Sequence, residues 1–232
     1  RGPVVQSLKG TERVLLYKHD YPSLLEPFRI NKFDITWVDA PDGFNIDIAA
    51  IEDAIVNNKV DIVAISHVQW TSGYKVDIAH ICKLCKEHGV MLFVDGTQSM
   101  GAHVIDLTAL HIDVYAASNY KWMNAGFGTG VLSIKQSFLQ KYPPVVGGNN
   151  SYRMIDGIMQ YRPSVLSYEP GHPNMYGLTV LDAAIKHKQE LGVAAITASN
   201  EKLTQLLLDN IKDLPVKLIG DFSTKNRASI VI

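Results

Sequence analysis

The sequence has 232 residues, of which 47% are hydrophobic and 19% are charged. This composition is typical of a folded globular protein and excludes an intrinsically disordered chain. The 22 basic and 23 acidic residues leave a formal net charge of −1, which argues against nucleic-acid binding through bulk charge. No apolar run approaches the roughly 18–20 residues of a membrane-spanning helix, and the first residues lack the apolar region of a signal peptide. We therefore expect a cytoplasmic protein that binds neither nucleic acid nor membrane.

Short apolar runs alternate with helical patterns in the first half of the chain. Five runs predict strands: RVLLY at 13–17, DITWVDA at 34–40, DIVAISHV at 61–68, VMLFVDG at 90–96 and DVYAASN at 113–119. Two helices are expected between them, at 45–58 with Asp47 or Asn45 as its cap and at 77–88 with Gly89 as its stop signal. This alternation predicts right-handed βαβ crossovers, and hence an α/β fold whose mostly parallel sheet has helices on both faces.

The pattern changes from about residue 135. KYPPVVGGNNSYR at 141–153 predicts a long loop. Amphipathic helices are expected at 177–192 and at about 197–212, and strands at 215–219 and in the final NRASIVI. We divide the chain into a large domain over 1–176, which we expect to be incomplete at its amino end, and a linking helix with the beginning of a smaller, truncated α+β domain over 177–232.

Cys82 and Cys85 form a C-x-x-C pair, a spacing found in redox sites and in zinc sites. Ile78, Ile81, Leu84 and Cys85 lie at helical spacing, and no second cysteine pair completes a tetrahedral site. We therefore expect both thiols to be buried or half-buried on a helix.

Histidines give no metal-binding pattern in this sequence. No two of them have a ligand spacing such as H-E-x-x-H, and we predict no metal. His103 and His111 are expected to face solvent.

Polar side chains follow two predicted strands at the edge where an open parallel sheet binds ligands. Asp95 and Gln98 follow the fourth strand, and Ser118, Tyr120 and Lys121 follow the fifth. A charged amine near a core is costly unless it is paired or neutralised, although a lysine that emerges into solvent gives the same pattern. An acid at one strand end, a lysine 26 residues later at the next and three glycines beyond it form the combination that a pyridoxal phosphate enzyme requires.

The passages FVDGTQSMGAHVIDL at 93–107 and DVYAASNYKWMNAGFGTG at 113–130 carry a family resemblance. They resemble the class V aminotransferases of the fold-type I pyridoxal phosphate superfamily, which also contains cysteine desulfurases and kynureninases. The resemblance covers roughly residues 10–232. It implies that the large domain binds pyridoxal phosphate and that the substrate is an amino acid.

The resemblance assigns a role to each of the polar side chains. It implies that Lys121 forms the Schiff base and that Asp95 pairs with the pyridine nitrogen. It also implies that Gln98 donates to the cofactor's phenolate oxygen, and that Ser118 and Tyr120 hydrogen-bond its phosphate. Tyr120 stands where many members have histidine, which looks more like the kynureninase branch, whereas Gln98 matches the aminotransferase and desulfurase branches.

Two further stretches are similar to the family. In HVQWTSGYKVD at 67–77, Trp70 occupies a position beside the cofactor, and a tryptophan at a strand end is also commonly a packing residue. EPGHPNMYGL at 169–178 resembles the family's EGTPN segment, which reaches the cofactor phosphate of a partner subunit; here His172 stands at the threonine position. The resemblance therefore implies a homodimer with shared active sites.

Our main prediction for the function is a class V aminotransferase acting on an amino acid through Lys121. The alternatives are a kynureninase-like hydrolase, a cysteine desulfurase or lyase, and a catalytically inert assembly module. A nucleotide-binding dehydrogenase is disfavoured because no G-x-G-x-x-G opens the first helix. We expect the residue that stacks on the cofactor ring and the residue that binds the substrate carboxylate to lie outside the given chain, with Arg153 and Arg162 as the candidates within it for the carboxylate.

Overall fold

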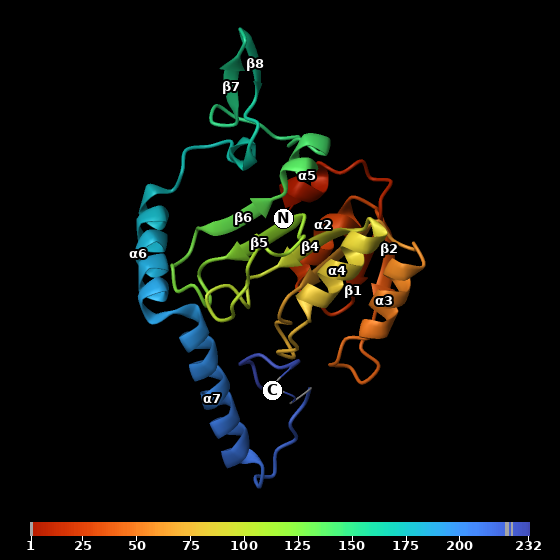
Figure 1. Cartoon of the computed structure of the whole chain (residues 1–232), viewed down its shortest axis with the longest axis vertical. Coiled ribbons are helices and arrows are strands. Elements are labelled where there is room, and N and C mark those ends of the chain that lie inside the picture. Colours follow the sequence, from red (N-terminus) through yellow and green to blue (C-terminus); the bar gives the residue numbers. More distant parts are fainter. Residues whose placement is uncertain (1, 221–222, 224) are drawn as a thin grey trace.

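The computed structural model describes residues 2–220, 223 and 225–232, and its main feature is a six-stranded sheet (Figure 1). The strand order is β2-β1-β3-β4-β5-β6. The first five strands in the chain run parallel, and β6 pairs antiparallel with β5. The strands are β1 (Arg13–Tyr17), β2 (Asp34–Val38), β3 (Ile62–Ser66), β4 (Met91–Asp95), β5 (Val114–Ser118) and β6 (Gly130–Ile134). The predicted mostly parallel α/β sheet is confirmed, and β6 was not predicted.

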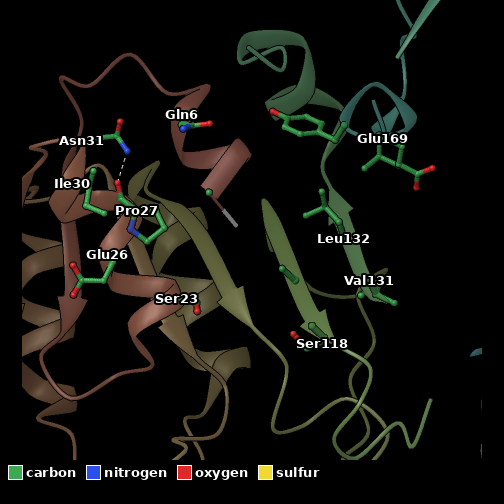
Figure 2. A pocket seen from close by; sticks show the side chains of 16 residues that line it. Gln6, Ser23, Glu26, Pro27, Ile30, Asn31, Ser118, Val131, Leu132 and Glu169 are labelled. Carbon is green, nitrogen blue, oxygen red and sulfur yellow. Dashed lines mark hydrogen bonds between the residues drawn. The ribbon is translucent and has the colours of Figure 1, made fainter. Parts of the chain in front are cut away.

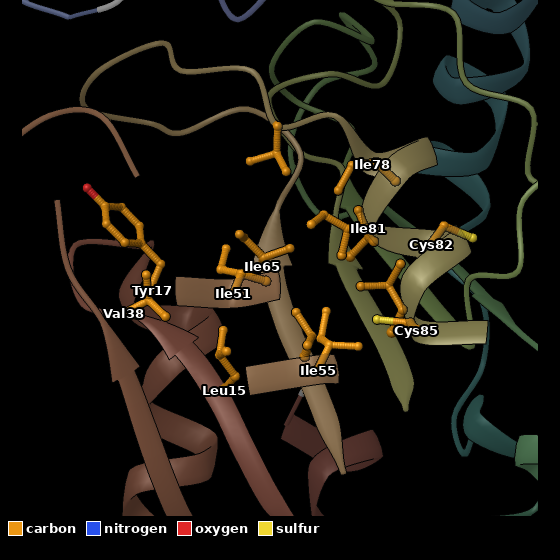
Figure 3. Packing of buried hydrophobic residues seen from close by; sticks show 14 of the residues in the cluster. Leu15, Tyr17, Val38, Ile51, Ile55, Ile65, Ile78, Ile81, Cys82 and Cys85 are labelled. Atoms are coloured by element: carbon orange, nitrogen blue, oxygen red, sulfur yellow. The ribbon is translucent and has the colours of Figure 1, made fainter. Parts of the chain in front are cut away.

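Helices cover both faces of the sheet, as predicted. On one face α3 (Ile48–Val56) and α4 (Ile78–His88) pack on alternate strand residues such as Leu15 and Ile65 (Figure 3). On the other face α1 (Gly2–Gln6), α2 (Pro22–Ile30) and α5 (Gln136–Lys141) pack on the intervening residues, such as Leu16 and Phe93. Because a strand points successive side chains to opposite faces, each central strand contributes to two separate cores.

Both crossover helices begin where their sequence signals lie, and α4 also ends at its signal. The Asp47 carboxylate accepts a hydrogen bond from the Ala50 amide at 3.0 Å, and Asp77 accepts one from His80 at 3.1 Å. These side chains satisfy amide groups that the first turn of a helix leaves without partners. Gly89 ends α4 with a φ of 69°, in the left-handed region that favours glycine. Cys82 and Cys85 are buried on α4 as free thiols, as expected.

The second half of the chain departs further from the sequence prediction. The predicted loop at 141–153 is irregular only over residues 142–151, because Lys141 ends α5 and β7 (Tyr152–Ile155) forms a hairpin with β8 (Ile158–Tyr161). This hairpin projects from the body of the molecule (Figure 1). A short 3₁₀ helix, η1 (Val165–Tyr168), leads to α6 (Met175–Leu191) and α7 (Val193–Ile211), which confirm the two expected helices. None of the helices in the described ranges is both long enough and apolar enough to cross a bilayer.

The two strands predicted near the end of the chain are wrong. Residues 215–219 are irregular, and among the described residues their backbone bond to a distant segment runs from the Ile219 amide to the Ile232 carbonyl. In NRASIVI, Arg227 makes a single isolated bridge with Tyr74. A strand requires a ladder of successive bridges to a neighbour. In the described part of the chain NRASIVI is bonded to residues 73–75 through a single bridge, and residues 215–219 pair with no strand.

His67 and His103 lie together beneath the carboxyl edge of the sheet. Both are buried, and their ring centroids are 6.4 Å apart. The expectation that His103 faces solvent is therefore wrong: the turn after β4 folds it back against the residue that follows β3. His111 is exposed, as expected. Burial lowers the pKa of His67 to about 4, with His103 and Lys75 adding to the effect and Asp77 opposing it.

This shift predicts a pH dependence of stability. His67 binds a proton in the unfolded chain below its usual pKa of 6.5 but in the folded chain only below about 4. The free energy of unfolding should therefore fall by up to about 3 kcal/mol as the pH drops from 6.5 to 4. Urea denaturation across this range should show a smaller fall for His67→Gln. The exposed His187 on α6 is the control, and an unchanged pH dependence in His67→Gln would contradict the assignment.

Candidate functional site

A pocket of about 140 Å³ opens at the carboxyl ends of the parallel strands. Its wall is built by the turns that follow β1, β3, β4 and β5, because parallel strands end at the same edge of a sheet. Six of the seven predicted site residues line it: Trp70, Asp95, Gln98, Ser118, Tyr120 and Lys121. The structure thus brings together side chains that lie up to 51 positions apart in the sequence.

Lys121 lies in the turn after β5, between two aromatic rings. Its Nζ is 5.6 Å from the centroid of the Tyr21 ring and 5.9 Å from that of Tyr120. The turn is held by Asn119, which is fully buried: its carbonyl accepts from the Ala125 amide at 3.0 Å, and its side chain donates to the Thr129 hydroxyl at 3.2 Å. Two aromatic faces favour a cation between them, and the held turn limits where the amine reaches.

Asp95 ends β4 with only 3% of its surface exposed. Its carboxylate accepts from the Thr97 amide at 2.9 Å, and the Thr97 hydroxyl accepts from the Ser118 amide at 3.0 Å. These bonds join the ends of β4 and β5, and they fix the position of the Asp95 carboxylate relative to the turn that carries Lys121. Gly96 is required there, because a Cβ at this position would lie 1.9 Å from the Tyr115 hydroxyl oxygen.

Gln98 is half-buried and oriented by a neighbour. Its amide oxygen accepts a hydrogen bond from the Trp122 indole at 3.0 Å. This bond occupies the oxygen and leaves the amide nitrogen as the donor of this side chain. The arrangement is compatible with the predicted donation from Gln98 to an oxygen of a bound molecule.

Four further lining residues were not predicted: Tyr21, Ser23, Ser66 and Thr97. Tyr21 and Trp70 form one corner, with their rings edge to face at 5.5 Å, and the Trp70 indole donates to the His19 carbonyl at 3.2 Å. Tyr21 follows the first predicted strand at the same sheet edge as Asp95. Ligands bind beyond the carboxyl ends of parallel strands, so a search of the residues after this strand would have identified Tyr21.

The remaining candidates lie elsewhere. His172 is exposed in the segment before α6 and does not line the pocket. Arg153 is exposed on the projecting hairpin, and the guanidinium of Arg162 donates to the Asn150 carbonyl at 2.7 Å. Neither arginine lines the pocket. Within the described ranges, no three His, Cys, Asp or Glu side chains are grouped so as to hold a metal ion.

A larger groove of about 800 Å³ adjoins the pocket (Figure 2). One wall comes from α1 and α2, and the other from β5, β6 and the η1 segment. Ser23 and Ser118 line both cavities, so the pocket and the groove meet at two hydroxyl groups. A molecule larger than the pocket can therefore extend into the groove between α2 and the strands β5 and β6.

Comparison with known proteins finds relatives over nearly the whole chain. A probable cysteine desulfurase of Pyrococcus abyssi is 26% identical over 228 residues, which cover 96% of this chain and 56% of that protein. A cysteine desulfurase of Escherichia coli is 27% identical over 180 residues, covering 76% of this chain and 43% of that protein. The chain thus spans about half the length of the curated relatives it matches.

Solved structures show the same fold. The apo cysteine desulfurase of Thermococcus onnurineus superposes with a TM-score of 0.88 at 23% identity, over 99% of this chain and 58% of that one. The cystine C–S lyase C-DES, in complex with its product cysteine persulfide, gives 0.84 at 23% identity, over 97% of this chain and 63% of that one. A variant of C-DES carries glycine covalently linked to its pyridoxal phosphate cofactor. The class-V aminotransferase family profile matches residues 4–232, and the chain belongs to this family.

Proposed function

We propose that this protein is a pyridoxal phosphate enzyme that breaks the carbon–sulfur bond of an amino acid, as a cysteine desulfurase does. The observation that carries the proposal is the pocket that holds Lys121 beside the buried Asp95 at the ends of adjacent strands. The named relatives support the desulfurase alternative more than our main prediction of an aminotransferase, which is not confirmed. The cofactor prediction agrees with the family and with the cofactor of C-DES.

The side chains present fit this cofactor. An amine, a buried carboxylate, an amide donor and hydroxyl groups converge on one pocket, and these match an aldehyde, a ring nitrogen, a phenolate oxygen and a phosphate respectively. When bound, pyridoxal phosphate supplies an electron-withdrawing ring that stabilises negative charge on a substrate carbon. Asp95 would keep a proton on the ring nitrogen, because a buried carboxylate favours a positive charge beside it.

Lys121 would hold the cofactor covalently and move a proton at the substrate's α-carbon. The Tyr21 and Tyr120 rings limit the positions open to its Nζ atom. We propose Tyr21 as the aromatic residue that packs against the cofactor ring, which replaces our expectation that this residue lies outside the chain. Ser118, where the pocket meets the groove, and Tyr120, on the pocket wall, would bind the phosphate.

The remaining predictions concern assembly and location. His172 is exposed before α6, a position compatible with the predicted reach into a partner's site. The homodimer with shared sites, the cytoplasmic location and the division at residue 176 stay predictions.

The reaction type is tested by product analysis of the purified protein with pyridoxal phosphate, L-cysteine and excess dithiothreitol. A desulfurase removes sulfur from cysteine and leaves alanine, and the dithiol takes the sulfur and releases it as sulfide while it is oxidised to a disulfide. We expect alanine and sulfide in equal amounts. Pyruvate and ammonia with sulfide would indicate β-elimination instead. In a parallel reaction to which an α-keto acid is added as acceptor, transfer of the amino group to that acid without release of sulfide would support the aminotransferase.

The attachment point is tested by borohydride reduction and peptide mapping. We expect the reduced cofactor on Lys121, and none in Lys121→Ala. Lys135→Ala is the matched control variant, because Lys135 lies at the opposite end of the sheet beside Asp113. Label on Lys75 or Lys135 in the wild-type protein would refute the assignment.

Asp95→Asn tests the contribution of the carboxylate. The variant keeps nearly the same shape but loses the charge that holds a proton on the ring nitrogen. We expect it to retain the cofactor's absorbance while turnover falls by about 10²–10⁴-fold, or roughly 3–5 kcal/mol of transition-state stabilisation. Turnover and melting temperature are measured on the same sample. Unchanged turnover with a lowered melting temperature would show that Asp95 only stabilises the turn.

A further inference from the structure

Asp20 is a buried carboxylate that the proposed function leaves without a role. It lies in the turn between β1 and α2, with 3% of its surface exposed. Its Oδ1 accepts hydrogen bonds from the Tyr21 amide at 2.7 Å and from the Ser66 hydroxyl. Its Oδ2 accepts from the Ser66 amide at 2.8 Å and from the Gln69 side chain at 3.1 Å. Both oxygens thus bind two donors each, and the donors come from two separate segments of the chain.

These bonds join the two segments that build the aromatic corner of the pocket. Tyr21 follows Asp20 directly, and Trp70 follows Gln69. A further bond between the same segments runs from the Trp70 indole to the His19 carbonyl. Because Tyr21 also lies 5.6 Å from the Lys121 amine, a movement of the turn after β1 would change the surroundings of that amine.

We propose that Asp20 is a positioning residue, whose buried carboxylate fixes the turn after β1 to the end of β3 and thereby sets the Tyr21–Trp70 corner of the pocket. Its effect on a cofactor rests on the proposed function, whereas its effect on the corner does not. No substrate or cofactor contact is assigned to Asp20 itself.

The carboxylate is costly to bury, which argues for a specific role. Burial raises the pKa of Asp20, and the donors from Ser66, Tyr21 and Gln69 oppose that shift by stabilising the ionised form. A buried charge retains its ionised form only while such donors are present. A purely structural link between two turns would be made at lower cost by neutral groups.

An amide at this position does not reproduce the four bonds. In Asp20→Asn one carboxylate oxygen is replaced by an NH₂ group, and this group faces hydrogen-bond donors whether it replaces Oδ1 or Oδ2. In the less disruptive orientation the NH₂ replaces Oδ1 and the Ser66 hydroxyl turns to accept from it. The Tyr21 amide is then left without its acceptor, so the change falls on the residue that forms the corner.

The corner is tested without cofactor by ¹⁹F NMR of the protein labelled with 5-fluorotryptophan. The sequence has three tryptophans, and single Trp→Phe variants assign their signals. In Asp20→Asn we expect the Trp70 signal to shift or broaden while that of Trp37, on β2, stays in place. The matched control is Asp113→Asn, which replaces a carboxylate that accepts from the Leu92 amide at 2.9 Å, at the opposite edge of the sheet.

Cofactor binding gives a second measurement. We expect the dissociation constant of pyridoxal phosphate, followed by its absorbance, to rise about 10–100-fold in Asp20→Asn, because small displacements of a binding wall have large effects. Asp113→Asn should leave it unchanged. Ser66→Ala removes one donor and should change both measurements in the same direction but less, which keeps the test available if Asp20→Asn fails to fold.

The outcomes separate the two proposals. An Asp20→Asn protein whose Trp70 signal and cofactor affinity match those of Asp113→Asn would overturn the positioning role. A wild-type protein that binds no pyridoxal phosphate would overturn the proposed function. In that case the ¹⁹F comparison alone decides whether Asp20 sets the corner.

Discussion

The parallel pairing of β4 with β3 and β5 is the constraint on which the site depends. Register places Asp95 opposite Ser66 on one side and Ala116 on the other. The turns after β3 and β4 therefore begin at one level, and β5 continues two residues further, to Ser118. Every lining side chain lies within six residues of a strand end. Parallel neighbours need long crossovers, and α4 supplies the one from β3 to β4 while its apolar side packs on the sheet. Core packing and pocket geometry are thus consequences of the same pairing.

The sequence predicted the strands whose residues are mostly buried and the helices whose caps are recognisable. The central strands are buried on both faces and read as continuous apolar runs, and α3 and α4 have aspartate caps. The pattern failed for α2, which contains Pro27 inside the helix, and for β6, which lies at the lateral edge of the sheet and is largely exposed or half-buried. It also failed for residues 215–219, whose apolar run has the composition of a strand but pairs with no strand among the described residues. Propensity describes a segment alone, whereas a strand also requires a neighbour.

The site residues that are easiest to predict from the sequence are charged side chains that stand at or just after the end of a predicted strand. Asp95 and Lys121 carry charges at strand ends, which is conspicuous in a sequence, and the fold then places them together. Asp20 is equally charged and equally close to a strand end, but its partners Ser66 and Gln69 are 46 and 49 residues away, and their burial depends on how two turns pack. A contact of this kind has no local pattern. The sequence therefore identified residues with a chemical signature and missed those that set their surroundings.

The buried polar groups around the pocket indicate that its shape is maintained at a cost to stability. Among the described residues, the buried side-chain atoms without a hydrogen-bond partner include His67 Nδ1, Gln69 Oε1 and Asn119 Oδ1. All three belong to the turns after β3 and β5, where the pocket forms. Each such atom destabilises the fold, and apolar residues of similar size would avoid that cost. The other bonds of two of these side chains explain their presence: Gln69 donates to Asp20, and Asn119 holds the turn that carries Lys121. The polar atoms that fix the pocket wall are therefore kept for the geometry of the site rather than for the stability of the core.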